Sequence, residues 1–130
     1  MHSRELAELF FHKARQDEFV LDKLISDPAS PDEVIGFHAQ QAVEKMLKAV
    51  LALHAVRLGK IHEIGQLRAL LRKNGIAHPS EFHELDRLSP FAADFRYKDL
   101  PSGPEHPFDR MWAADSVRRV KVWAEAAVRG

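Results

Sequence analysis

Hydrophobic residues recur at helical spacing along most of the chain. Residues 3–25 form the first predicted helix, which ends at Ser26-Asp27-Pro28. One face of it carries a row of side chains spaced by three and four residues, as in an amphipathic helix: Leu6, Phe10, Ala14, Asp17, Leu21 and Leu24. Asp17 is the one carboxylate in this inward-facing row, so we expect it to need a cation or a donor.

The second predicted helix covers residues 30–56 and has a clear start signal. Ser30 is followed three residues later by Glu33. This spacing predicts a capping box, in which each side chain accepts a backbone N–H at the helix start. Pro31 suits the first helical position, where no N–H is needed. Gly59 is the expected stop.

Three further helices are predicted after Gly59. They cover residues 62–73, 80–89 and 107–127, with Pro90 ending or kinking the middle one and a further turn at 91–95. A loop at 97–106 precedes the last helix, whose core-facing residues are expected to be Met111, Ala114, Val117, Val120 and Ala124. No segment alternates as a strand does. The pattern predicts one all-α domain over residues 1–130, an antiparallel up-and-down bundle of four to five helices.

Composition narrows the function classes. Lys+Arg and Asp+Glu both number 19, which disfavours a strongly basic, sequence-blind nucleic-acid binder. The chain has no cysteine, so thiolate catalysis and thiolate metal sites are excluded. We see no targeting segment and no apolar stretch long enough to span a bilayer, and therefore expect a cytoplasmic protein without a membrane partner.

A polar row lies on the second helix. Phe37, Gln41, Glu44 and Lys48 follow one another at steps of four, three and four residues, which places them on one stripe. Beside it runs an apolar stripe that consists of Ala39, Ala42, Val43, Met46 and Val50, and Gln40 and Lys45 lie at the edges. The spacing alone favours a solvated surface, because Gln, Glu and Lys are good helix formers.

The residues around this row resemble a known family. The stretch GFHAQQAVEKMLKAVL, residues 36–51, closely resembles the F-x-A-Q-Q-A-x-E-K-x-L-K-A signature of HEPN domains of the nucleotidyltransferase-associated type. Asp17 resembles the acidic position of the family's first helix, and His62 resembles its T-H-D-L histidine. Residues 95–99, FRYKD, resemble its A-R-Y-P-D element.

The resemblance implies a helical bundle that is commonly a homodimer. It also implies a nucleotide- or RNA-related binding subunit that works with a minimal nucleotidyltransferase partner, as in a toxin–antitoxin pair. The candidate polar site that follows comprises Asp17, Gln41, Glu44, Lys48, His62, Arg96 and Tyr97. In this site Glu44 and Lys48 would orient polar groups, Arg96 would hold phosphate, and a tyrosine would stack or hydrogen-bond.

Asp17 has two interpretations. Its partner could be Lys48, His62 or Arg96, and the pair could simply hold the bundle in register. Alternatively, these groups line a polar cleft between the first three helices and the loop that carries Arg96. The sequence favours neither over the other.

Whether the chain is an enzyme stays open. Many HEPN proteins are metal-independent ribonucleases with an arginine, four to six residues, and then a histidine. Here nine residues separate Arg96 from His106. Two pairs match the spacing, Arg57 with His62 and Arg72 with His78, but both lie around the third predicted helix instead of near the last one. We therefore favour a subunit without a complete ribonuclease motif. The alternative is a ribonuclease or toxin that acts as a dimer, with His62, Arg96 and His106 as weak catalytic candidates.

No metal or cofactor motif is evident. The eight histidines form neither an H-x3-H nor an H-E-x-x-H pattern, and no glycine-rich phosphate loop occurs. We therefore expect no metal site and no bound cofactor. Trp112 and Trp123, eleven residues apart on the last helix, could belong to the core or to a dimer interface.

Overall fold

The computed structural model describes residues 2–92 and 108–130. Arg96, Tyr97 and His106 lie outside these ranges, as do the loop predicted at 97–106 and residues 93–95 of the turn predicted at 91–95. The described elements are four α-helices and one 3-10 helix: α1 Ser3–Ile25, α2 Asp32–Leu53, α3 Ile64–Lys73, η1 Ser80–Phe91 and α4 Arg110–Arg129.

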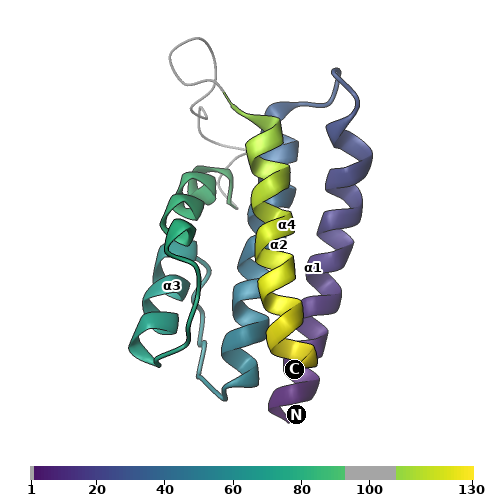
Figure 1. Ribbon diagram of the computed structural model, residues 1–130. Helices are drawn as coiled ribbons and strands as arrows, with labels where there is room; N and C mark the ends of the chain where they lie inside the picture. Colours follow the sequence, from purple (N-terminus) through teal and green to yellow (C-terminus); the bar gives the residue numbers. More distant parts are fainter. Residues whose placement is uncertain (1, 93–107) are drawn as a thin grey trace.

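Three long helices, α1, α2 and α4, lie side by side, and α3 and η1 pack along one flank of them (Figure 1). The start of α1 and the end of α4 lie at the same end of the bundle, so these two helices run in opposite directions. Helices α2 and α4 run in the same direction, because the chain returns to the other end through the α3–η1 segment. The predicted all-α bundle is confirmed, with α1 antiparallel to the other two long helices.

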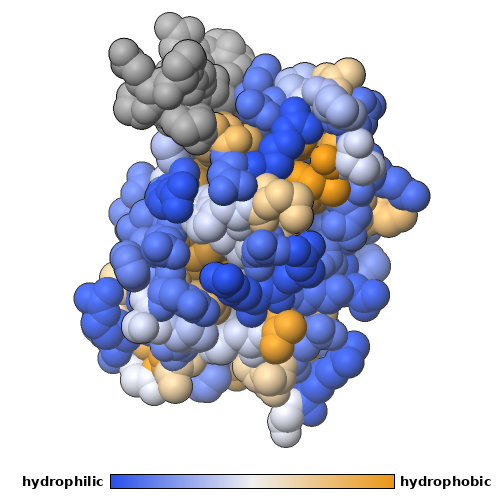
Figure 2. All heavy atoms as spheres, turned by 45° about the horizontal axis from the view of Figure 1, so that its top comes forward, coloured by the Kyte–Doolittle hydropathy of each residue, from blue (hydrophilic) through white to orange (hydrophobic). Residues whose placement is uncertain are grey.

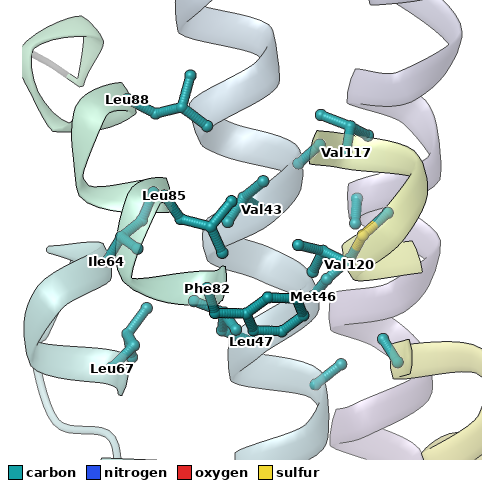
Figure 3. Packing of buried hydrophobic residues seen from close by; sticks show 14 of the residues in the cluster. Val43, Met46, Leu47, Ile64, Leu67, Phe82, Leu85, Leu88, Val117 and Val120 are labelled. Carbon is teal, nitrogen blue, oxygen red and sulfur yellow. The ribbon is translucent and has the colours of Figure 1, made fainter. Parts of the chain in front are cut away.

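Helix α2 is the centre of the bundle. From Ile35 to Ala52 every residue is buried or half-buried, because α1, α3, η1 and α4 all pack against this helix. Its predicted apolar stripe is buried as expected. The core side chains labelled in Figure 3 come from four elements: Val43, Met46 and Leu47 of α2, Ile64 and Leu67 of α3, Phe82, Leu85 and Leu88 of η1, and Val117 and Val120 of α4.

The last helix departs from its predicted face at one position. Met111 is 62% exposed, so its placement in the core was wrong. It lies in the first turn of α4, whose buried side there is formed by Ala113 and Ala114 instead. The two tryptophans of α4 are half-buried against the core. Trp123 donates its indole N–H to the carbonyl of Ala77 at 3.0 Å, and the Arg87 guanidinium lies 4.1 Å from the Trp112 ring centroid.

The start of α2 is held by a distant residue and not by a capping box. Pro31 is the N-cap residue, and it makes no side-chain cap hydrogen bond. Instead, the Arg110 guanidinium donates to the Asp32 carboxylate at 3.0 Å, to the Asp27 carbonyl at 3.1 Å and to the Ser30 carbonyl. The predicted capping box was therefore wrong, because α4 supplies the side chain that holds the turn before α2.

The end of α2 comes three residues earlier than predicted. Ala55 has a φ of 58°, and its N–H reaches the Ala52 carbonyl at 2.9 Å. The N–H of Val56 bonds to the carbonyl of Leu51 at 3.0 Å. These two bonds define a Schellman motif, which ends a helix by turning the chain through the left-handed region.

The remaining helices also differ at their ends. Helix α3 begins at Ile64 and not at residue 62, so His62 belongs to the preceding loop. Helix α4 begins at Arg110, where the Asp109 side chain accepts the N–H of Trp112. The predicted helix at 80–89 is a 3-10 helix that includes Pro90 and continues to Phe91.

The surface view in Figure 2 shows a face that is mostly hydrophilic, with hydrophobic residues in small separate patches. Among the described helices, none is both long enough and apolar enough to cross a membrane.

Helix η1 packs closely on α2 at Gly36, and this contact leads to a first prediction. A Cβ atom added there would lie 2.4 Å from the Phe91 ring. We expect Gly36→Ala to lower the free energy of unfolding by roughly 1–3 kcal/mol, because overpacking forces the two helices apart. Urea denaturation monitored by circular dichroism measures this change.

Gly65→Ala is the matched control. A Cβ atom there would meet Asp86 at 3.5 Å, an ordinary contact. We expect this variant to be neutral or more stable by up to about 1 kcal/mol, because alanine favours the helix. Equal effects of the two substitutions would contradict the tight Gly36–Phe91 contact.

Candidate functional site

The polar row of α2 forms a continuous hydrogen-bonded network. The Gln41 amide donates to the Gln40 side-chain carbonyl at 2.7 Å, and the Gln40 amide donates to Glu44 Oε1 at 3.0 Å. The Lys48 ammonium donates to Glu44 Oε2 at 2.9 Å. We call these residues, together with His62, the α2 network.

Glu44 and Lys48 lie inside the protein. Their side chains are only 7% and 8% exposed, and Gln40 is 1% exposed. The interpretation of Glu44 and Lys48 as solvated surface was therefore wrong. A repeat of polar residues at helical spacing shows which residues share a face, but it does not show that neighbouring segments cover that face too.

The network compensates for the removal of its charges from water. Taking a carboxylate and an ammonium out of water is costly unless hydrogen bonds and the opposite charge replace the solvent. Both Glu44 oxygens accept bonds, and Lys48 donates to two groups. In the part of the chain that the structure describes, no buried side-chain nitrogen or oxygen lacks a partner.

His62 joins the network from the loop before α3. Its Nδ1 lies 2.9 Å from Lys48 Nζ and 3.4 Å from Glu44 Oε2. Since an ammonium can only donate, the closer contact has Nδ1 as the acceptor, which places the ring proton on Nε2. The His62 side chain is 69% exposed. The buried pair therefore holds an exposed imidazole in one orientation.

Helix α1 supplies an aromatic neighbour to the network. Lys48 Nζ lies 5.9 Å from the centroid of the Phe10 ring, a distance that suits a cation–π contact. Phe10 is half-buried. The ammonium thus lies between the Glu44 carboxylate, the His62 ring and an aromatic face.

Asp17 belongs to a second polar cluster. Its Oδ2 lies 2.5 Å from Lys45 Nζ, and its Oδ1 lies 3.0 Å from His38 Nδ1. The predicted partners Lys48 and His62 were wrong, since both contact Glu44, and Arg96 lies outside the described residues. Lys45 and His38 lie on the same face of α2, opposite α1. Their contacts with Asp17 therefore connect α1 to α2.

The structure therefore divides the predicted site in two. It brings together Gln41, Glu44, Lys48 and His62, whereas Asp17 lies in the other cluster. Arg96 and Tyr97 fall outside the described residues, as does His106, so their predicted roles stay predictions.

Three residues of the α2 network and the Asp17 cluster were not among the predicted site residues. Gln40 links Gln41 to Glu44, while His38 and Lys45 hold Asp17. A signal was present for two of them. Gln40, Glu44 and Lys48 are spaced by four residues, and Gln41 and Lys45 are as well, so two parallel rows of polar residues run along the helix.

Within the described residues, no group of three His, Cys, Asp or Glu side chains is arranged to hold a metal ion. The α2 network contains one carboxylate and one histidine next to an ammonium, which would repel a cation.

A comparison with models of known protein families identifies the family of this chain. A model of the HEPN domain matches residues 28–127, so the chain belongs to the HEPN domain family. The match begins after α1 and covers the α2 network and all but the last two residues of α4. No curated protein and no solved structure is significantly similar to the chain.

The buried pair leads to a prediction about stability. Lys48→Met leaves the Glu44 carboxylate buried without its cation, and we expect a loss of about 3–5 kcal/mol in the free energy of unfolding. Adding Glu44→Gln should recover a large part of this loss, because the buried charge is then gone. Urea denaturation of the single and double variants measures both effects.

The control is a pair of the same type on the surface. Arg118 pairs with Asp115 three residues earlier in α4, and both side chains are more than 40% exposed. Arg118→Gln should change stability by no more than about 1 kcal/mol. A Lys48→Met variant as stable as Arg118→Gln would argue against the burial of the charged pair.

Proposed function

We propose that this HEPN protein is a nucleotide- or RNA-related binding subunit and that the α2 network forms part of its ligand site. HEPN membership supports a nucleotide- or RNA-related role in general. The observation that carries the finer proposal is the exposed His62 ring, held by the buried Lys48 and Glu44. Fixed polar groups at the protein surface, supported by buried partners, are typical of binding sites.

The charge of the network limits how it would bind a nucleotide. Glu44 balances Lys48, and Asp17 balances Lys45, so neither cluster offers an excess positive charge. The network would therefore bind through directed hydrogen bonds from His62 Nε2 and the Gln41 amide group. We propose that Arg96 supplies the charge for a phosphate, because guanidinium groups bind phosphate oxygens in pairs.

We further propose that the ligand site is completed by a partner, a minimal nucleotidyltransferase. The support is the likeness of residues 36–51 to HEPN domains of the nucleotidyltransferase-associated type, together with the balanced charges of the network. A neighbouring reading frame with a G-S-x-x-x-G and D-x-D pattern, whose product copurifies with this chain, would support the pairing. A light-scattering mass of two chains for the purified protein would support the homodimer proposed from the same likeness.

Nucleotide binding is tested by calorimetry with ATP and AMP. We expect saturable binding by the wild type. His62→Gln should weaken it about ten- to a hundredfold, because one charge-assisted hydrogen bond to phosphate is worth roughly 1.5–3 kcal/mol. His83→Gln is the control, since His83 is an exposed histidine of η1 outside the network. No binding by the wild type at millimolar nucleotide would contradict the proposal.

The same variants test RNA cleavage. Wild-type protein incubated with mixed RNA in the presence of a chelator should leave the RNA intact, since the arginine–histidine motif is incomplete. Cleavage that His62→Gln abolishes and His83→Gln preserves would overturn this expectation. It would show instead that the protein is a metal-independent ribonuclease with His62 as a catalytic residue.

A further inference from the structure

A hollow on the surface lies between the start of α1 and the end of α4. It has a volume of about 350 Å³ and shares no lining residue with the α2 network or with the Asp17 cluster. Pockets that bind small molecules commonly have volumes of about 300–1,000 Å³. The hollow is therefore large enough for a ring-sized molecule.

The floor of the hollow is apolar. Phe11 of α1 and Val128 of α4 line it, and they are 8% and 7% exposed. Both side chains also pack in the protein interior, so their exposed edges form a fixed surface. An apolar group placed on this floor would leave water without displacing any polar partner.

One arginine of the rim is fixed across the two helices. Arg4 Nη1 donates to the carbonyl of Val128 at 2.8 Å. Glu8 lies 3.7 Å away from the same nitrogen, which is too long for a strong hydrogen bond. The Arg4 guanidinium is thus oriented by a backbone oxygen and keeps donors available for a ligand.

The rim as a whole carries more positive than negative charge. Arg4, Arg15 and Arg129 face two carboxylates, Glu8 and Glu125. Arg129 pairs with Glu125 at 3.2 Å. Arg15, in contrast, has no hydrogen bond or ion pair with any residue that the structure describes. One guanidinium therefore stands next to an apolar floor without a counter-charge.

We propose that this hollow binds a small molecule with one phosphate or carboxylate group on an apolar, ring-sized body. The oxyanion pairs with Arg15 and with the free donors of Arg4, and the ring lies on Phe11 and Val128. A guanidinium binds such an oxyanion through two parallel hydrogen bonds, and the apolar floor selects against inorganic ions. The site is independent of the proposed nucleotide site.

Titration followed by amide chemical shifts tests the proposal with four probes. Phenyl phosphate and benzoate carry both features and distinguish the two oxyanions. Inorganic phosphate lacks the ring, and benzyl alcohol lacks the charge. We expect phenyl phosphate or benzoate to cause saturable shifts at Phe11 and Val128, and the two incomplete probes to bind at least about tenfold more weakly.

Arg15→Gln should weaken binding of the better probe about tenfold, since it removes the uncompensated charge. Arg72→Gln is the control, because Arg72 is an exposed arginine of α3 that does not line the hollow. Any one of three results would overturn the proposal: no binding of any probe, equal binding of all four probes, or binding that Arg15→Gln leaves unchanged. His62→Gln should leave phenyl phosphate binding intact, so failure here and failure of nucleotide binding can be told apart.

Discussion

The burial of one ion pair on the central helix sets the constraints on the rest of this structure. Glu44 and Lys48 occupy a helix that other segments cover on every side, and both side chains are almost inaccessible to water. Charges in such a position must be matched by partners from the protein. Gln40 from the same helix and His62 from a distant loop provide these partners. The buried pair therefore requires particular polar residues beside it on α2 and on the neighbouring loop.

The same demand ties separate segments of the chain to α2. Lys48 fixes the loop before α3 through His62, and Lys45 fixes α1 through Asp17. The Arg110 guanidinium of α4 fixes the turn before α2. Apolar packing supplies most of the driving force for folding, but these directional contacts determine how each neighbour is oriented. The one exposed group of the α2 network, the His62 imidazole, is therefore oriented by its contacts with Lys48 and Glu44.

Charge balance separates the two candidate binding regions. In the α2 network every described charge has an opposite partner, so an anionic ligand would need a cation from elsewhere. The hollow between α1 and α4, in contrast, has an uncompensated positive charge, because Arg15 lacks a counter-charge among the described residues. The two regions thus suit different ligands: one would act by directed hydrogen bonds and with help from a partner, and the other would attract an oxyanion by itself.

The sequence by itself determined the fold class, the bounds of α1, the apolar stripe of α2 and the spacing of its polar residues. Periodicity reports these features because it depends only on which residues share a face. Tertiary structure alone decided that the polar face of α2 is buried, that Asp17 pairs with Lys45 and His38, and that Arg110 replaces the expected capping box. Each of these outcomes depends on which distant segment covers a given face, and local spacing carries no information about that.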